Sequence, residues 1–373
     1  MTLCVVALIA SEFMPVSLLS PIAQDLGLSE GQAGQAISIS GLFAVITSLS
    51  LRRVAGGIDR RYVLTVMTAL LALSGMIVAW SPNYATLMVG RCLLGVAIGG
   101  YWSLSFAVTM RILPAASVPL GLSVIHSGAA FATTVSAPLG SYLAALIGWR
   151  WTFFAVVPIA AVAAAALWAT MPPVPPRKSR PGGSWRLLAY RPVLLGFAAV
   201  LLLFLGQFAL FTYLRPFLER VTHVNIATLS GLLLVVGLAG LVGSGVISVI
   251  VKLGLNRILL GMPLVLASVA VVLVLFGGNV WVVAVALAVW GMASAPAPVF
   301  WTLWLTQQRP QDSEAIGGLM VAFIQTAITL GAAVGGLVLD WQGPYANAMA
   351  AAVVLALAAG VAWVASRSVT ARA

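Results

Sequence analysis

Long apolar segments recur along the chain and are separated by short stretches of polar residues. Each segment runs for about 20 residues, the length that a helix needs to cross the hydrocarbon core of a bilayer. Backbone groups in lipid must be paired within a helix or a closed barrel, and barrel strands would be shorter and would alternate in polarity. The pattern therefore predicts an all-α membrane protein with about twelve transmembrane helices.

The composition excludes a soluble protein. Of the 373 residues, 62% are hydrophobic and only 7% are charged, whereas soluble domains carry about 25% charged residues. The formal net charge of +11 comes mainly from short loops on one side of the predicted membrane, so we expect a lipid bilayer rather than nucleic acid as the partner. Basic loops of this kind lie in the cytoplasm, and both chain termini are expected on the same side. The first segment has no basic n-region, so we expect a retained helix rather than a cleaved signal peptide.

The longest polar interruption lies between Met171 and Pro192 and is rich in proline and glycine, as linkers often are. It predicts an N-terminal six-helix bundle at 1–171, a cytoplasmic linker at 172–191 and a C-terminal six-helix bundle at 192–373. The halves resemble each other weakly, since Glu12–Pro15 in the first span has a counterpart in Tyr213–Pro216 in the seventh. Two pseudo-symmetric bundles form a transporter architecture, with the substrate site between them near the bilayer midplane.

Glu12 is the one acid deep inside an apolar span. A charge at the bilayer centre costs roughly 2.5–3.5 kcal/mol or more, so such residues are usually functional, and carboxylates there carry protons or cations through pumps. Arg91 is the one base well inside a span of the first half. Because each charge alone is expensive to bury, we expect the two side chains to face each other or share a polar cavity and to couple transport to protons. A purely structural ion pair is the alternative.

Polar and aromatic side chains gather at mid-span depth in several predicted helices. Apolar walls with a few directed polar groups suit an uncharged, planar, partly polar solute. The candidate substrate-binding residues are Phe13, Trp102, Gln207, Phe211, Tyr213, Trp290 and Gln325. For each aromatic residue the alternative is packing or lipid contact. For the two glutamines binding is favoured, because an amide exposed to lipid is unfavourable.

Two patterns suggest moving parts. The loop Asp59-Arg60-Arg61 places an acid at a cytoplasmic helix end, where it can latch the halves through charge pairs or serve only as a topology determinant. The fifth span has a proline bend at Pro138 and a stripe of small residues, which can act as a joint between the halves or as ordinary helix packing. The small residues of this stripe are Gly128, Ala132, Ser136, Gly140 and Ala144.

The remaining candidate residues give weaker indications of function. His126 in the fifth span can relay protons near neutral pH, or it can be an ordinary packed histidine. Both cysteines, Cys4 and Cys92, lie in predicted spans, so we expect no disulfide. The sequence has no metal-ligand spacing and nothing that points to a cofactor, so we expect neither. Pro296 and Pro298 are expected to break the backbone ladder of the tenth span, since proline removes a backbone donor. Such a break can line a transporter's cavity, or it can be a harmless kink.

These motifs resemble the major facilitator superfamily, in its drug/proton antiporter branch, over essentially the whole chain. The loop Asp59-Arg60-Arg61 resembles the family's cytoplasmic loop motif, with Ala55 and Tyr62 where that motif usually has glycine. The segment Gly90–Gly95 resembles the fourth-helix motif, whose arginine is linked to proton transfer. Two segments resemble the fifth-helix antiporter motif, which favours export over uptake, with fewer glycines than its usual form: Ala137–Ser141 and Gly148–Arg150.

Four segments resemble more narrowly the bacterial purine ribonucleoside efflux pumps: Glu12–Leu19, Asp59–Val63, Gly99–Trp102 and Gln207–Pro216. This resemblance implies a proton-coupled secondary antiporter of the bacterial inner membrane that exports inosine- and guanosine-like solutes by alternating access. Sugar and multidrug exporters of the same superfamily share much of these motifs and remain alternatives.

Other classes of function are disfavoured. An intramembrane enzyme would need paired acids, a metal set or a nucleophile with its base, and the spans hold a single deep acid. A receptor or sensor would normally carry a soluble signalling domain. We therefore expect a monomeric transporter, not an enzyme, with protons and a small solute as its ligands.

Overall fold

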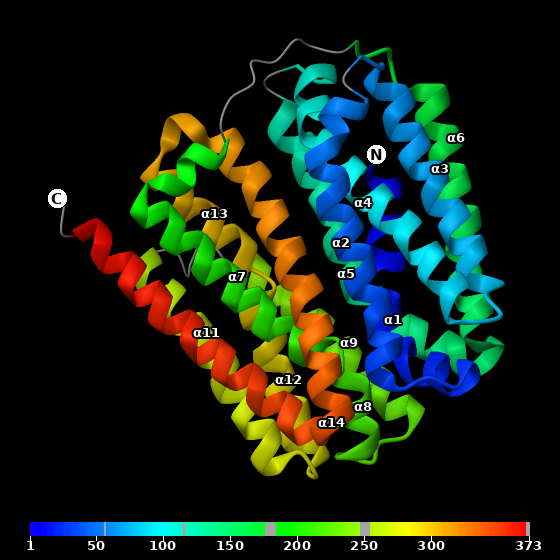
Figure 1. Ribbon diagram of the computed structural model, residues 1–373, viewed down its shortest axis with the longest axis vertical. Coiled ribbons are helices and arrows are strands. Elements are labelled where there is room, and N and C mark those ends of the chain that lie inside the picture. The colour runs from blue at the N-terminus through cyan, green and yellow to red at the C-terminus, as the bar shows by residue number, and fades with distance from the viewer. Residues whose placement is uncertain (56, 115–116, 176–183, 247–253, 371–373) are drawn as a thin grey trace. The chain divides into compact units, whose positions relative to one another are not determined.

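The computed structural model describes residues 1–373 except 56, 115–116, 176–183, 247–253 and 371–373 (Figure 1). In the described residues every regular element is a helix, which confirms the predicted all-α class. The chain divides into two compact units, Met1–Arg180 and Pro181–Ala373. The division falls inside the predicted linker, and each unit is described by itself below.

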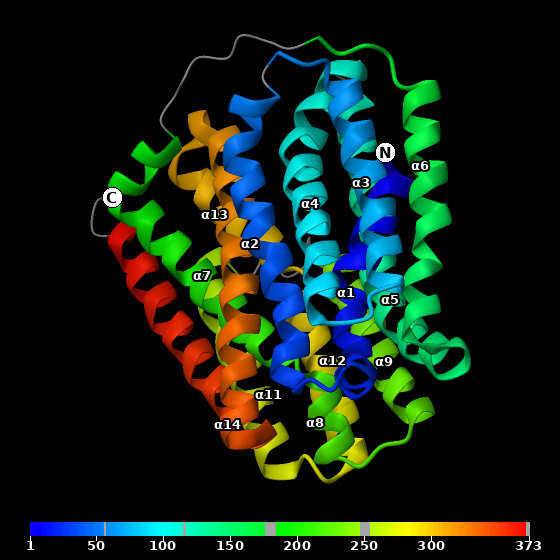
Figure 2. The same ribbon diagram turned by 45° about the vertical axis from the view of Figure 1, so that its right-hand side comes forward.

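The first unit is built from long helices that pack side by side (Figure 2). Its helices are α1 (Thr2–Leu26), α2 (Glu30–Val54), α3 (Arg60–Ala79), α4 (Tyr84–Ile112), α5 (Val118–Phe154) and α6 (Val156–Thr170). Helix α1 packs mainly on α5, α2 packs on α4, and α3 packs on both α4 and α6. Polar caps mark where helices begin just outside the apolar runs: Ser29 and Gln32 form a capping box for α2, and the Asn83 side chain accepts from Thr86 N in α4.

The second unit repeats this plan with more interruptions. Its helices are α7 (Arg191–Phe211), α8 (Leu214–Arg220), α9 (Ile226–Gly245), α11 (Leu255–Phe276), α12 (Val280–Ser294), α13 (Ala297–Gln308) and α14 (Ser313–Thr370), with short 3-10 turns at Ser184–Ala189 and Pro310–Asp312. Helix α7 packs on α14, α9 packs on α12, and α11 packs on both α12 and α14. The interruption between α12 and α13 confirms the break predicted from Pro296 and Pro298.

Ten stretches of the described residues are long and apolar enough to cross a membrane. Two of them, Ser127–Thr170 and Ile316–Ser368, contain an elbow at a glycine with positive φ: Gly148 at 82° and Gly343 at 84°. Glycine tolerates this conformation, whereas a side chain would strain it. After its elbow the second part of α14 runs back beside α7 (Figure 1). With these two stretches divided, the count agrees with the predicted twelve crossings.

The internal repeat is visible in how pairs of helices touch. In the first unit, a Cβ added to Gly95 of α4 would lie 2.2 Å from the carbonyl oxygen of Ser40 in α2. In the second unit, a Cβ added to Gly291 of α12 would lie 2.2 Å from the carbonyl oxygen of Val236 in α9. These are the fourth and second spans of each half, and both pairs approach so closely that only glycine fits.

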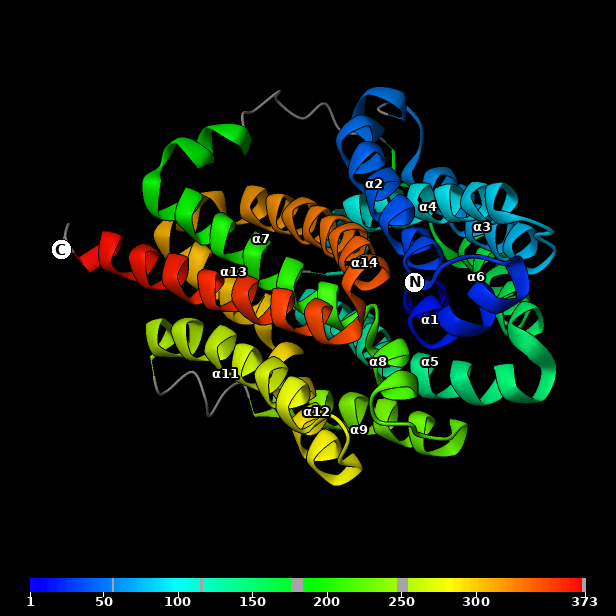
Figure 3. The ribbon, with the colours of Figure 1, turned by 60° about the horizontal axis from the view of Figure 1, so that its bottom comes forward.

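The small-residue stripe of α5 faces α1, which lies beside it in the first unit (Figure 3). A Cβ at Gly128 would meet the side chain of Thr2 at 2.6 Å, and a Cβ at Gly140 would meet Ser17 Oγ at 2.8 Å. Both contacts lie inside one unit. The joint between halves that the stripe suggested stays a prediction, as does the role of the Pro138 bend.

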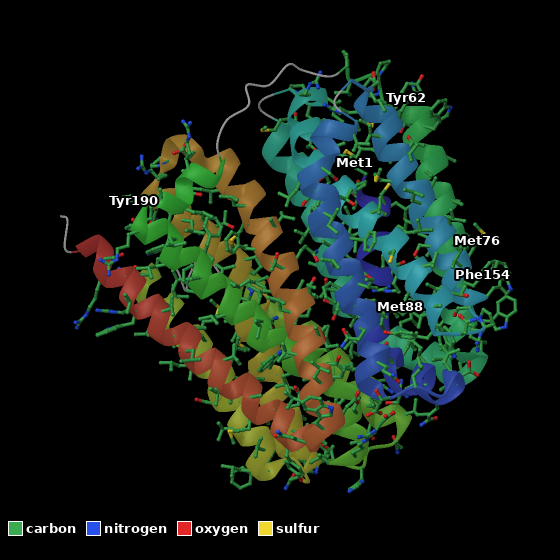
Figure 4. All side chains as sticks on the ribbon, in the orientation of Figure 1. Met1, Tyr62, Met76, Met88, Phe154 and Tyr190 are labelled. Atoms are coloured by element: carbon green, nitrogen blue, oxygen red, sulfur yellow. The ribbon has the colours of Figure 1, made fainter. Side chains whose placement is uncertain are left out.

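Aromatic pairs mark the two ends of the α3–α6 pair. Tyr62 and Trp168 have ring centroids 5.2 Å apart at one end, and Trp80 and Phe154 have centroids 5.3 Å apart at the other. Tyr62 and Phe154 are seen near opposite ends of this helix pair (Figure 4). Tryptophan and tyrosine favour membrane–water interfaces, so these pairs indicate where the two membrane surfaces meet the first unit.

Candidate functional site

The site begins with a gap in the backbone hydrogen bonding of α1. Pro15 lies inside this helix and has no N–H, so the carbonyl oxygen of Ser11, four residues earlier, lacks its usual helical donor. Ser11 is buried, with 6% of its surface exposed. A buried carbonyl without a donor is costly, so this position requires a donor from another part of the fold.

Arg91 of α4 supplies that donor. Its Nη1 lies 2.8 Å from the Ser11 carbonyl oxygen, and its Nε lies 2.9 Å from the carbonyl oxygen of Ala36 in α2. A longer contact of 3.5 Å joins Nη2 to the backbone oxygen of Glu12. One guanidinium, only 1% exposed, thereby holds three helices together. The close approach of α4 to α2 at Gly95, one turn further on, brings Arg91 within reach of Ala36.

Glu12 lies beside this junction and is also buried, with 5% of its surface exposed. Its carboxylate acts electrostatically on the Arg91 guanidinium. The three hydrogen bonds that Arg91 makes among the described residues all end on backbone oxygens. The structure therefore brings the two predicted residues together, but the arginine is fixed by main-chain acceptors and acts on the carboxylate through its charge.

This arrangement has a definite chemical capacity. A guanidinium keeps its proton in proteins, so Arg91 provides a constant positive charge. Glu12 is the group that can gain or lose a proton, and each change alters the net charge of a water-poor centre by one unit. Because α1, α2 and α4 meet at Arg91, a change of charge at Glu12 acts on the junction of three helices.

The predicted gating loop lies at the end of the first unit where α3 begins. Asp59 Oδ1 accepts from the backbone N–H of Arg61 at 2.8 Å, which caps α3, and from the N–H of Val174 at 2.9 Å. Val174 O in turn accepts from the N–H of Arg60 at 3.0 Å. Arg61 donates to the carbonyl of Trp168 and stacks on its ring. The described contacts tie this loop to the end of the first unit, so a latch between the halves stays a prediction.

The predicted substrate-binding residues divide between the two units. Phe13 and Trp102 are half-buried in the first unit. In the second unit, Gln207 and Phe211 are half-buried on α7, while Trp290 on α12 is 2% exposed and Gln325 on α14 is 8% exposed. A site shared by the two groups is a prediction of the sequence.

Tyr213 differs from the other candidates because its polar group already has a hydrogen-bond partner within the protein. Its hydroxyl donates to the carbonyl oxygen of Ala332 at 2.6 Å, and the residue is only 1% exposed. The hydroxyl is therefore engaged within the second unit. Gln207 keeps its capacity for a ligand, because its Oε1 is buried and meets no hydrogen-bond partner among the described residues.

The described residues assign no role to His126 or to the two cysteines. The side chain of His126 lies outside the described residues, so its relay role stays a prediction. Among the described residues, no cluster of histidine, cysteine, aspartate or glutamate side chains could hold a metal ion. Cys4 and Cys92 are both free.

Two residues were missed by the sequence reasoning. The Ser11 carbonyl could have been found, because Pro15 four residues later leaves it without a helical donor. Asn347 is an amide inside the last apolar run, is 2% exposed, and donates from Nδ2 to the carbonyl oxygen of Ala209 at 2.9 Å. An amide in an apolar run was the available signal.

Comparison with known proteins identifies one matching family model and several relatives that align with most of the chain. The family model described as Major Facilitator Superfamily matches residues 1–315. The chain is 46% identical over 370 residues to the transcription regulatory protein OpdE of Pseudomonas aeruginosa, covering 98% of this chain and 92% of that protein. It is 39% identical over 338 residues to the purine ribonucleoside efflux pump NepI of Salmonella paratyphi B, covering 90% of this chain and 85% of that protein.

A solved structure supports the fold. The crystal structure of a bacterial homolog to the human lysosomal transporter Spinster, in an inward-facing and unoccupied conformation, matches with a TM-score of 0.75 and 16% sequence identity. The match covers 98% of this chain and 95% of that one. At this identity the likeness concerns the fold alone.

Proposed function

Because the chain belongs to the major facilitator superfamily of membrane transporters, we propose that it is a proton-coupled antiporter that exports purine ribonucleosides. Export is driven by protons that enter the cell, and the two six-helix bundles alternate in opening the site to each side of the membrane. The protein acts in the bacterial inner membrane, with both termini in the cytoplasm. It is a transporter and not an enzyme.

One observation carries the proton coupling. Glu12 is a buried acid beside a buried arginine that holds α1, α2 and α4 together through the carbonyl oxygens of Ser11 and Ala36. With Glu12 ionised, the pair is neutral and the junction is stabilised. With Glu12 protonated, the centre carries an uncompensated positive charge that costs free energy in a low-dielectric setting. Protonation thus changes the stability of the junction, which a proton-driven conformational change requires.

The choice of cargo rests on chemistry and on one relative. A purine ribonucleoside is uncharged, offers a flat base for stacking, and carries polar edges that pair with amides. Aromatic faces and amides are the residue types that we place at the site, with Phe13 and Trp102 in one unit and Gln207, Phe211 and Gln325 in the other. The 39% identical pump is named for this cargo.

Sugars and amphipathic drugs are the rival cargoes. Pumps for cationic drugs favour several acids in the cavity, and the described residues contain one acid at membrane depth with a compensating arginine beside it. A growth test against purine analogues, sugars and dyes in cells that express the protein would separate these cargoes.

A second candidate function comes from the 46% identical relative, which is named a transcription regulatory protein. A membrane protein of this family could influence transcription by changing the internal concentration of an inducing solute, or by binding a solute without moving it. Binding of inosine to purified protein without any transport in liposomes would favour the regulatory candidate over the transporter.

The direct test uses purified protein in liposomes, labelled inosine and an imposed pH gradient. We expect inosine to accumulate with the gradient and to redistribute when the gradient is dissipated. With one proton exchanged per nucleoside, a gradient of one pH unit permits about tenfold accumulation at equilibrium. Absence of inosine movement in liposomes that contain folded protein would reject the proposed cargo.

A further inference from the structure

The seventh span is broken where its predicted substrate-binding residues lie. Helix α7 ends at Phe211 and α8 begins at Leu214. At the break the N–H of Tyr213 donates to the carbonyl oxygen of Leu210 at 3.1 Å rather than to that of Ala209. The Ala209 carbonyl is therefore left without its helical donor inside an apolar span, where an unpaired carbonyl is expensive.

Asn347 provides the missing donor from a distant part of the chain. Its Nδ2 lies 2.9 Å from the Ala209 carbonyl oxygen, and the two residues are 138 positions apart in sequence. Asn347 reaches this place because α14 turns at Gly343, where φ is 84°, and Asn347 lies one turn beyond that elbow. The elbow at Gly343 therefore places the Asn347 amide within hydrogen-bond distance of the Ala209 carbonyl oxygen.

The rest of the break is fixed by the first part of α14. The Tyr213 hydroxyl donates to the carbonyl oxygen of Ala332 at 2.6 Å. A Cβ added to Gly335 would lie 2.8 Å from the Ala209 carbonyl oxygen and 3.1 Å from the Tyr213 ring. Glycine at 335 is therefore required for α14 to come this close, and the α7–α8 break is held from two sides.

Stability alone does not explain an asparagine at this position. Its Oδ1 is buried and meets no hydrogen-bond partner among the described residues, so only one side of the amide is satisfied. A buried amide with an unpaired oxygen contributes little net stability, because the desolvation of that oxygen offsets the hydrogen bond made by the nitrogen. An apolar residue would pack in its place without this cost, but it would release Ala209.

We infer that Asn347 is a positioning residue, which holds the α7–α8 break through Ala209 and thereby sets how Gln207 and Phe211 are presented to the solute. This inference rests on the proposed function. Gln207 lies two residues before Ala209 and Phe211 two residues after it, so a change in the backbone at Ala209 reorients both side chains. Asn347 acts through them and need not touch the solute.

The test compares two variants of Asn347 with a matched control. Asn347→Leu keeps a similar volume and removes the donor, whereas Asn347→Gln keeps an amide donor. The control is Asn279→Ser in the same unit, because Asn279 is an exposed helix cap whose function serine also performs. For each protein, inosine transport in liposomes gives KM and kcat, and hydrogen exchange reports backbone protection over residues 207–217.

Asn347→Leu is expected to raise KM by about threefold to tenfold with little change in kcat, the range that one interhelical hydrogen bond supports. It should also speed exchange over residues 207–217. Asn347→Gln should fall closer to the unaltered protein, and Asn279→Ser should match it. A lower yield of folded Asn347→Leu with unchanged KM would show a merely structural role and overturn the inference, as would unchanged exchange.

Failure of the proposed function gives a different result. If the unaltered protein moves no inosine, the cargo is rejected, and hydrogen exchange alone decides whether Asn347 holds the break. Faster exchange in Asn347→Leu then retains the role of Asn347 at the break, and unchanged exchange rejects it.

Discussion

The carbonyl oxygen of Ser11 lies 2.8 Å from Nη1 of Arg91, and the residue that frees this carbonyl is Pro15 on the same helix. A proline that removes one helical hydrogen bond and an arginine that replaces it from another helix form a single unit of structure. This relationship places a permanent positive charge beside Glu12. The stability change caused by a substitution at Pro15 therefore depends on which residue is present at position 91, and the reverse also holds.

The coupling between these residues can be measured with a double-mutant cycle. Arg91→Met leaves the Ser11 carbonyl buried without a donor, at a cost of about 1–3 kcal/mol in addition to the effect on Glu12. Pro15→Ala restores a backbone N–H four residues after Ser11. We therefore expect Arg91→Met to be less damaging in the Pro15→Ala background, by about 1 kcal/mol. Denaturation of the purified variants in detergent would measure this difference in unfolding free energy. If the effects of the two substitutions simply add, Arg91 does not act through the Ser11 carbonyl.

The glycine contacts between helices predict a clear difference between two alanine substitutions. Gly95→Ala would put a Cβ 2.2 Å from the Ser40 carbonyl oxygen, so α4 must move away from α2. We expect a loss of about 1–3 kcal/mol in stability. Gly261→Ala in α11 meets nothing within 4 Å, and alanine favours helix, so this control should be neutral or stabilising. Thermal unfolding of both variants measures the difference, and equal midpoints would contradict the close approach of α4 to α2.

Two substitutions can separate the helix-capping role of Asp59 from its predicted role as a charge latch. Asp59→Asn keeps an Oδ1 that accepts from Arg61 and Val174 but removes the charge, whereas Asp59→Ala removes both acceptor and charge. We expect the Val174 amide to stay protected from hydrogen exchange in Asp59→Asn and to exchange faster in Asp59→Ala, since its partner is then lost. Loss of transport in Asp59→Asn with this protection intact would favour a charge latch.

Several features of this molecule were predictable because they depend on local pattern. Span number and helix class follow from segment length and backbone pairing in lipid. The break before Ala297 follows from two prolines. The proximity of Glu12 and Arg91 follows from the cost of burying either charge alone. In each case the chemical properties of a single residue or segment are enough to determine the structural feature.

Other features depend on which helix faces meet, and the sequence does not specify that choice. Arg91 and Glu12 were expected to face each other or to share a polar cavity. The sequence does not show that the hydrogen bonds of Arg91 end on the carbonyl oxygens of three residues, because Pro15 and the approach at Gly95 set where the guanidinium lies. The hydroxyl of Tyr213 is engaged by Ala332 on α14. Asn347 was missed because its partner lies 138 residues away.

We propose that Glu12 couples transport to protons, and inosine accumulation in liposomes under an imposed pH gradient tests this role most directly. The unaltered protein and an Asp340→Asn control, which removes an exposed carboxylate near the end of a span, should both accumulate inosine with the gradient. Glu12→Gln keeps the size of the side chain but cannot release a proton. It should exchange inosine across the membrane without accumulating it. Accumulation by Glu12→Gln with an unchanged dependence on the gradient would contradict the account.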